Sequence, residues 1–338
     1  MEWLLGKDPD ELTQIAEMLG LPRYTGKQLA DWLYKKQVKQ IGEMTNLSKV
    51  ARERLGAHYE VGGFAPEQVQ ESNDGTRKYL FPTKDRFFIE SVVIPDNDRV
   101  TLCVSSQAGC RMGCRFCMTA RQGFQAHLSA GEIIGQFQSI AEKSRLTNAV
   151  YMGMGEPMDN LDEVLQSLRI LTSEWGWGWS PRRITVSTIG ILPQLKRFLD
   201  QSECHLAVSL HHPFDACRQE LIPMQKAHPL ADILSLIRQY DFSGQRRVSF
   251  EYILFKGVND SLSHAVALAR LLKGLECRVN LIRYHAIPDN PLQPASAEAV
   301  ALFQKKLSEG GVLTTLRSSR GEDIWAACGL LSTQKRNG

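Results

Sequence analysis

The strongest constraint on the fold is an alternation of strand-like and helix-like segments that begins near residue 100. Six short runs rich in β-branched residues are separated by amphipathic stretches, and they cover residues 101–105, 149–152, 184–187, 206–210, 248–253 and 279–284. Such an order predicts parallel strands that helices cover on both faces. Six units are too few for a closed eight-stranded barrel. We therefore expect an α/β fold, an open partial (β/α)6 barrel, with its chemistry at the C-terminal ends of the strands.

The first 75 residues have a helical pattern instead. Asp8 and Pro9 offer an N-cap and a first helical position, and apolar residues then recur at helical spacing until Gly20. Two further helices are expected after Thr25 and Ser48. These features predict an N-terminal helical accessory domain at residues 1–75, with RNA binding as its expected role.

Extra strands are expected to flank the barrel. Residues 77–81 and 87–94 are rich in β-branched and aromatic residues on either side of a turn-like segment. The expected organisation therefore continues with a β-hairpin extension at residues 76–98 and the barrel at 99–290. Residues 291–338 are expected to form a helix, a strand near 312–318 and a loop that carries Cys328.

Composition sets the class of protein and its compartment. A chain of 338 residues with 43% hydrophobic content can bury a sizeable core, while a net charge of +3 does not by itself indicate a nucleic-acid binder. The basic residues do gather in clusters, which lie at 35–39, 182–183, 246–247 and 335–336. We find no signal-peptide pattern and no apolar run long enough for a membrane span. Eight cysteines in such a chain indicate the reducing cytoplasm.

Three cysteines follow the first barrel strand in the pattern C-x3-C-x2-C: Cys110, Cys114 and Cys117, with Phe116 before the last. Three thiolates on one short loop can hold three irons of a [4Fe-4S] cube and leave the fourth iron open to a small chelating molecule. Electron-carrying clusters normally take four thiolates. The main alternative is a tetrahedral zinc site with Cys103 as the fourth ligand.

Polar motifs also follow later strands. Gly153 and Gly155 would allow the backbone to approach a ligand closely, and the Glu156 carboxylate can accept hydrogen bonds from an ammonium group. Ser187 ends the third strand and His211 follows the fourth, so both are expected at the mouth of the barrel. Local capping hydrogen bonds are the alternative role for these two side chains.

With Phe116 and these strand-end motifs, the sequence resembles the radical S-adenosylmethionine (SAM) superfamily. Two further cysteines narrow the resemblance: Cys103 on the first strand, and Cys328 among small residues near the C-terminus. Cys204, Cys217 and Cys277 lack such a context and are expected to be small buried apolar side chains. The sequence resembles the RlmN family, bacterial radical SAM methyltransferases of adenine C2 in 23S rRNA and tRNA, in segments 44–48, 74–78, 102–107, 122–124, 153–157, 209–211 and 320–329.

The resemblance implies a role for each matched residue. One [4Fe-4S] cluster would be bound by Cys110, Cys114 and Cys117. A methyl group would be carried by Cys328, the resolving thiol would be Cys103, and the proton acceptor would be Glu90. SAM would be contacted by Gly155, Glu156, Ser187, Ser209, Leu210 and His211. Many relatives have Asn after the sixth strand where this chain has His285, so the last SAM contact is expected to be a histidine here.

The implied reaction explains why these groups are needed. Adenine C2 lies between two ring nitrogens and is a poor nucleophile, so a carbon radical must attack it. Cys328 would take a methyl group from one SAM, and a radical made from a second SAM would remove hydrogen from that methyl. The resulting radical would add to C2, and a transient Cys103–Cys328 disulfide would release the product. The adenine must also leave its stack.

The resemblance further implies partners: 23S rRNA, tRNA and an electron donor such as flavodoxin or ferredoxin, with no membrane and a monomeric chain. Three alternatives stay open. A Cfr-like enzyme would use the same two cysteines on C8 of the same adenine. A radical SAM activase that makes a glycyl radical would need no such thiol pair. A metal-bound RNA-binding module would have no catalytic role.

Overall fold

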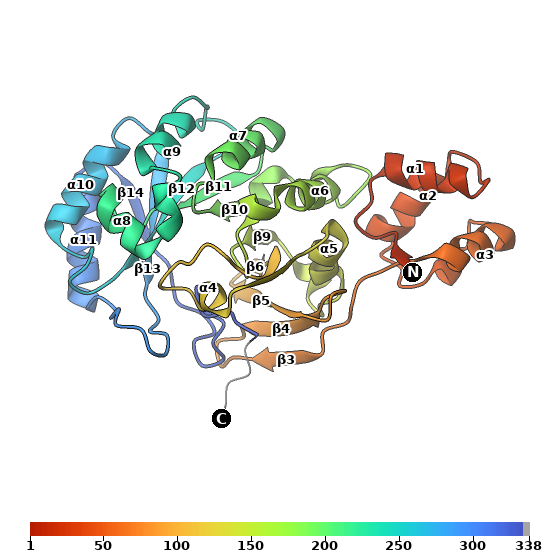
Figure 1. The fold of residues 1–338 in the computed structure, drawn as a ribbon, viewed down its shortest axis with the longest axis horizontal. Coiled ribbons are helices and arrows are strands. Elements are labelled where there is room, and N and C mark those ends of the chain that lie inside the picture. Colours follow the sequence, from red (N-terminus) through yellow and green to blue (C-terminus); the bar gives the residue numbers. More distant parts are fainter. Residues whose placement is uncertain (334–338) are drawn as a thin grey trace.

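The computed structural model describes residues 1–333, and its centre is a ten-stranded sheet in the order β14-β13-β12-β11-β10-β9-β6-β5-β4-β3 (Figure 1). Since β14 and β3 stand at opposite ends of this order, the barrel is open, as the sequence predicts. The strands are β3 (Gln68–Glu71), β4 (Arg77–Pro82), β5 (Phe88–Asp96), β6 (Arg99–Cys103), β9 (Asn148–Tyr151), β10 (Ile184–Thr188), β11 (His205–Ser209), β12 (Val248–Leu254), β13 (Cys277–Arg283) and β14 (Leu313–Leu316).

The barrel half of this sheet is parallel. From β6 through β9 to β13 each strand pairs in parallel with the next, which confirms the six predicted β/α units. The strand expected near 312–318 is β14, and it joins the same sheet in parallel with β13. Every residue of β12 is buried, because helices cover one face of the strands and the barrel interior lies on the other.

Helices cover the outside of the barrel (Figure 1). The short α4 follows the cysteine loop, and a capping box formed by Ser129 and Glu132 begins α5. In residues 1–333 no helix is long and apolar enough to cross a bilayer. The helices of the barrel are α4 (Met118–Gln122), α5 (Ala130–Gln138), α6 (Leu161–Thr172), α7 (Leu192–Gln201), α8 (Asp215–Leu221), α9 (Leu230–Ile237), α10 (Leu262–Leu272) and α11 (Ala297–Glu309).

The other end of the sheet is antiparallel and larger than the predicted hairpin. β3, β4 and β5 pair in turn and join the barrel through β6, where Val92 lies opposite Cys103. Residues 68–71, which we assigned to the helical domain, therefore form the edge strand β3. Its sequence, Gln-Val-Gln-Glu, has a single apolar residue, and Val69 is about half exposed. An exposed edge strand lacks the apolar alternation by which strands are recognised.

The N-terminal module begins with the predicted helices. Asp8 caps α1 (Pro9–Met18) by accepting hydrogen bonds from Asp10 and Glu11, and Ser48 caps α3 (Lys49–His58). Between them, α2 (Thr25–Ala30) continues as one π-helical turn (Asp31–Lys35). A short parallel pair not predicted from sequence, β1 (Glu2–Trp3) with β2 (Tyr59–Glu60), brings the two ends of the module together.

The module packs closely on α5. A Cβ on Gly6 would lie 2.3 Å from the backbone nitrogen of Gly131, so two glycines permit this contact. Gln138 of α5 also donates a 2.9 Å hydrogen bond to the Leu33 carbonyl. Side chains of both parts belong to one continuous hydrophobic core. The module is thus anchored on the barrel, beside α5 and α6 (Figure 1).

The basic clusters have different structural roles. Arg182 and Arg183 are exposed, whereas Arg246 is buried and donates to the Ser202 carbonyl beside Glu203. Arg246 therefore stabilises the fold rather than offering a free cation. Lys335 and Arg336 lie outside the described residues.

Candidate active site

A cavity of about 260 Å³ opens at the C-terminal ends of the parallel strands, where barrel chemistry is expected. It gathers residues from segments far apart in the sequence, between Ile94 and Leu331. Of the predicted site residues, those that line it are Cys103, Cys110, Cys114, Cys117, Gly155, Glu156, Ser187, Ser209, His211, His285 and Cys328. Leu210 and Glu90 are not among the lining residues.

The cysteine loop is folded by local contacts. Gly113 has a positive φ of 71°, and the Cys117 amide donates to the Cys114 carbonyl at 3.2 Å. Cys110 bonds to the Gly123 carbonyl, which approaches so closely that a Cβ on Gly109 would lie 1.8 Å from it. These turns direct all three thiols into the cavity.

Burial raises the pKa of the Cys110 thiol to about 12, and it raises the pKa of Cys114 and Cys117 as well. A buried thiol with a raised pKa keeps its proton at neutral pH in the absence of a metal. Binding of a metal ion displaces that proton and leaves the thiolate as a ligand. Among the residues that the structure describes, no three Cys, His, Asp or Glu side chains are grouped as ligands of a single ion. In a [4Fe-4S] cube each thiolate binds its own iron, so the three cysteines need not converge on one point. This donor set fits such a cluster.

The glycine-rich turn after β9 lies against the same cavity. Gly155 has a φ of 99°, and a Cβ there would lie 2.6 Å from the Gln107 side chain. Gln107 in turn accepts a 2.8 Å hydrogen bond from the Glu156 amide, which fixes the turn. Burial raises the pKa of Glu156 to about 7, even though the Ile189 and Met158 amides donate to its carboxylate. This carboxylate is suited to receive a cationic group from a ligand.

Two buried residues that we did not predict hold the ends of β10 and β11. Arg218 of α8 has no exposed surface and donates to the carbonyls of Ile189, Ser209 and Leu210 at 2.7 to 3.0 Å. Asn259 is also fully buried and donates to the His211 carbonyl at 2.6 Å. A lone Arg or Asn in a sequence is usually exposed, so only the three-dimensional arrangement shows these roles.

His211 is held in an unusual conformation. Its φ is 55°, in the left-handed region that non-glycine residues seldom adopt. The Ile253 amide donates to Nδ1 at 3.0 Å, so the ring proton lies on Nε2. Burial, with a smaller contribution from nearby Arg218, lowers the pKa of His211 to about 3. A neutral ring therefore stands edge-to-face against Phe116 of the cysteine loop.

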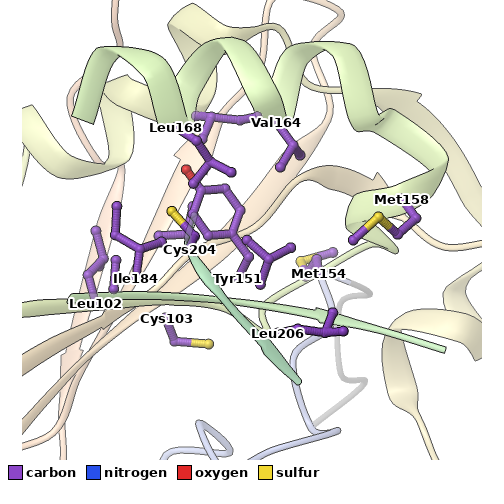
Figure 2. Close-up of a cluster of buried hydrophobic side chains, with 14 of the residues drawn as sticks. Leu102, Cys103, Tyr151, Met154, Met158, Val164, Leu168, Ile184, Cys204 and Leu206 are labelled. Carbon is purple, nitrogen blue, oxygen red and sulfur yellow. The ribbon is translucent and has the colours of Figure 1, made fainter. Parts of the chain in front are cut away.

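Cys103 points into the cavity from β6. Figure 2 shows its sulfur on the opposite side of the strands from Tyr151, which packs against Val164 and Leu168 of α6. The neighbouring Leu102 is completely buried, as the alternation of a strand requires. Burial raises the pKa of Cys103 to about 12, and Cys328 adds to that rise.

Cys328 reaches the cavity from the C-terminal loop that follows β14. The Met118 amide at the start of α4 donates to the Gly329 carbonyl at 2.8 Å, which places this loop beside the cysteine loop. The Cys328 side chain keeps accessible surface because it faces the cavity, although protein surrounds it. Burial raises the pKa of Cys328, and Arg317 partly offsets that rise. Cys103 and Cys328 are both free thiols, so the expected disulfide is not formed here.

A polar network not predicted from sequence stands beside this pair of thiols. Arg317, directly after β14, lies with Nε 3.5 Å from a Glu251 carboxylate oxygen. The other Glu251 oxygen accepts a 2.8 Å hydrogen bond from Asn280. Glu251 is 3% exposed, so its charge is balanced inside the protein by Arg317. The arrangement fixes a guanidinium next to Cys328.

The antiparallel extension clamps the loop that carries Cys328. Asp323 accepts hydrogen bonds from the Ser72 hydroxyl at 2.5 Å and the Asn73 amide at 3.1 Å. In the reverse direction, Asp74 accepts from the Gly321 amide at 2.9 Å. The turn between β3 and β4 is therefore joined to the C-terminal loop by contacts on both sides.

Comparisons with known proteins bear on this site. A profile of the Radical SAM superfamily matches residues 104–269, and one of the ribosomal RNA large subunit methyltransferase N-terminal domain matches residues 3–61. A probable dual-specificity RNA methyltransferase RlmN of Phocaeicola vulgatus is 56% identical over 98% of this chain and 95% of its own length. The chain belongs to the RlmN family.

Other relatives agree with this assignment. The dual-specificity RNA methyltransferase RlmN of Syntrophus aciditrophicus is 44% identical over 96% of this chain and 94% of its own length. The crystal structure of a radical SAM methyltransferase from Sphaerobacter thermophilus is 40% identical, with a TM-score of 0.92 over 98% of this chain and 99% of that one. The radical SAM fold predicted from sequence is thereby confirmed.

Three of the residues matched to the RlmN family, Leu210, His285 and Glu90, differ in how they are placed relative to the cavity. Leu210 is fully buried and offers only its backbone, whose carbonyl accepts from Arg218. His285 lines the cavity, with Nε2 3.1 Å from the Ser319 hydroxyl. Glu90 on β5 forms a buried 2.9 Å ion pair with Lys78 and accepts from the Ser332 amide at 3.0 Å. Its carboxylate thus lies beside the cavity rather than in its lining.

The cysteines outside the cavity follow the expectation only in part. Cys204 is buried and Cys277 is half-buried, but Cys217 is exposed. The prediction for Cys217 is wrong because this residue lies on the outer face of α8, whose inner face carries Arg218.

Proposed function

We propose that this protein methylates C2 of adenine in 23S rRNA and tRNA through a methyl-cysteine intermediate. The observation that carries the proposal is that Cys103 and Cys328, from distant parts of the chain, line the same cavity as the three clustered cysteines. The general chemistry of the radical SAM superfamily needs only the three cysteines that bind the cluster. A pair of additional thiols at the same cavity is what a reaction through a covalent thioether requires.

Cys110, Cys114 and Cys117 would hold the [4Fe-4S] cluster, and two SAM molecules would be used in each turnover. When bound, the cluster and SAM supply a carbon radical able to remove a hydrogen atom from a methyl group. Glu156 would accept hydrogen bonds from the SAM ammonium group. Ser187, Ser209, the Leu210 backbone, His211 and His285 would bind the rest of that molecule.

Cys328 would carry the methyl group, and Cys103 would resolve the covalent intermediate. Cys328 as a thiolate forms a bond to the SAM methyl carbon while the bond from that carbon to the sulfonium breaks. Loss of one hydrogen atom leaves a carbon radical on Cys328, which forms a bond to adenine C2. For release, the C2 proton leaves, the carbon–sulfur bond of Cys328 breaks and the new methyl group gains a proton. Deprotonated Cys103 bonds to the Cys328 sulfur. One electron must also leave the adduct for the step to balance, and the cluster held by Cys110, Cys114 and Cys117 would be its acceptor.

The disulfide formed in this way must be reduced by an external thiol before the next turnover. That requirement agrees with a protein that works in the reducing cytoplasm.

Glu90 is the proposed acceptor of the C2 proton. Lys78 forms a buried 2.9 Å ion pair with its carboxylate, which positions that carboxylate beside the cavity. Glu90 would exchange its contact with the Ser332 amide for the substrate.

The test is in vitro methylation with reconstituted protein, SAM and a chemical reductant. Transcripts of the rRNA segment and of tRNA would be digested to nucleosides and analysed by mass spectrometry against C2-methyl and C8-methyl standards. We expect 2-methyladenosine from both RNAs. An 8-methyl product would favour the Cfr-like reaction, which uses the same cysteines. SAM cleavage without any RNA product would favour an activase and overturn the proposal.

A further inference from the structure

A second hollow, of about 650 Å³, lies on the outer side of the cysteine loop. Cys114 and Ala120 line both this hollow and the active-site cavity. The loop itself is therefore the wall between the two spaces. A group seated in the second hollow would lie directly against Cys114, a proposed cluster ligand.

This position matters because the cluster must receive electrons while the inner cavity is in use. Cys103 and Cys328 face the inner cavity, which must also admit an unstacked adenine. An electron carrier cannot occupy that entrance at the same time. Electron transfer slows steeply with distance, so the thin wall at Cys114 is the favourable route from outside.

The hollow is held open by fixed contacts. Its walls are the outer face of α8, with Cys217 and Glu220, and the segment 289–292. The Arg115 amide donates to the Leu221 carbonyl at 3.0 Å, and the Arg115 carbonyl accepts from Asn290 at 2.5 Å. The cysteine loop is thus tied to both walls. A preformed surface of this kind loses little entropy when a partner binds.

The lining of the hollow carries equal numbers of cations and carboxylates, and one more exposed cation, Lys256, adjoins it. Arg115, Arg121 and Lys256 (beside the lining residue Gly257) are exposed, against the carboxylates of Glu220 and Asp289. Within residues 1–333 the Arg115 guanidinium makes no hydrogen bond or ion pair, whereas Arg121 donates to the Pro288 carbonyl. An exposed, unpaired cation beside Cys114 favours a partner with negative charge.

We propose that this hollow docks an acidic electron-carrier protein whose redox group lies near its surface. One electron would pass from the partner's reduced group to the cluster across the wall at Cys114, with no transfer of atoms. The Arg115 guanidinium would contact carboxylates on the partner. The inference rests on the proposed function, since a radical SAM enzyme needs such a reductant.

The experiment compares the intact, cluster-loaded protein with Arg115→Glu and Glu220→Lys. The probe is a flavodoxin with its reductase, and each protein is also assayed with dithionite, which needs no docking site. The ratio of the flavodoxin-driven to the dithionite-driven rate of SAM cleavage cancels any effect on the cluster itself. Binding of oxidised flavodoxin is measured separately by fluorescence anisotropy at low and moderate salt. Arg270→Glu on α10, far along the chain from the cysteine loop, is the matched control.

We expect Arg115→Glu to lower the ratio and the affinity about tenfold at low salt and less at moderate salt. Glu220→Lys is expected to raise both, so a folding defect in one variant cannot imitate the pattern. Arg270→Glu should leave both quantities unchanged.

Equal loss with both reductants would overturn the proposal, as would unchanged flavodoxin binding in both variants. Weaker RNA binding with normal flavodoxin binding would assign this face to RNA instead. The proposed function is tested separately, since RNA methylation with dithionite does not involve this surface.

Discussion

The two groups of cysteines that face the cavity are built in different ways. Cys110, Cys114 and Cys117 lie on one loop, and contacts within residues 109–123 fold it. Cys103 and Cys328 come from opposite ends of the barrel sequence. They face one cavity because β14 extends the parallel sheet and the antiparallel extension clamps the loop after it. The first group depends mainly on neighbouring residues, although Arg115 and Met118 also bond to distant segments, and the second depends on the whole sheet.

The largest effect is expected at the first group, the three cysteines of the loop. Cys114→Ala removes one of three thiolates, and the remaining two cannot hold a site-differentiated cube. We expect complete loss of cluster assembly and of methyl transfer, measured by iron and sulfide content and by RNA product. A fully loaded cluster in Cys114→Ala would show that the loop is not the cluster site.

The second prediction tests the pair formed by Cys103 and Cys328. Cys103→Ala should stop turnover after the carbon–carbon bond has formed, because no thiol remains to displace Cys328 from the methylene group. We expect a stable protein–RNA crosslink at Cys328, detected by denaturing gels and mass spectrometry. Cys328→Ala should give neither crosslink nor methylated RNA. Normal release of methylated RNA by Cys103→Ala would contradict the mechanism.

The third prediction concerns the guanidinium beside the pair. Burial raises the pKa of Cys328 and Arg317 lowers it, so Arg317→Met should raise that pKa further. Only the thiolate attacks SAM, and its fraction falls tenfold for each pH unit below the pKa. A rise of roughly one unit would therefore slow Cys328 methylation about tenfold at neutral pH, with convergence towards wild type at high pH.

Cys328 methylation would be followed by mass spectrometry in single-turnover reactions across a pH series. Arg317→Lys keeps the charge and is the matched control, expected to restore most of the rate. Identical pH profiles for wild type and Arg317→Met would exclude this role for Arg317.

The fourth prediction tests the clamp. Burial would raise the pKa of Asp74, but hydrogen bonds from Gly321 and Thr76 lower it to about 2 from 3.8. A depressed pKa means that the carboxylate stabilises the fold at neutral pH, and that this contribution is lost as pH falls from about 4 to about 2. Because Asp74 is exposed, we expect Asp74→Asn to cost about 1 kcal/mol at pH 7, after allowance for solvent screening.

The measurement for the clamp is hydrogen exchange of residues 317–333 at pH 7, with urea unfolding at pH 7 and pH 3. Faster exchange confined to this segment is expected, and the difference in unfolding free energy should shrink at the lower pH. Asp98→Asn, on the exposed turn after β5, is the control. Unchanged exchange would mean that Asp74 does not hold the Cys328 loop.

The smallest effect is expected outside both groups, in the N-terminal module. Lys35 and Lys39 are exposed, whereas Lys36 already pairs with Asp31 at 3.3 Å. Replacing Lys35 and Lys39 together by Ala should weaken RNA binding about threefold and make its salt dependence shallower. Dithionite-driven SAM cleavage should not change. An unaltered salt slope would remove this cluster from the RNA interface.

The sequence predicted the cysteine loop, the six barrel strands and their parallel order, because a local pattern of neighbouring residues specifies each of them. It did not predict β3, whose exposed residues lack an apolar pattern, nor the buried roles of Arg218 and Asn259. Arg246 illustrates the same limit. Its charge suggested a basic cluster, yet the side chain is buried against the Ser202 carbonyl.

By itself, the sequence determined the spacing of three thiols, the alternation of strands and helices, and the helix caps at Asp8, Ser48 and Ser129. These depend on contacts within a few residues, where the backbone leaves few choices. The tertiary structure alone decided that Arg317 stands beside Cys328, that Glu251 balances it, and that Glu90 is paired with Lys78. Such pairs join distant residues, and their charges can be buried only once the packed sheet brings opposite partners together.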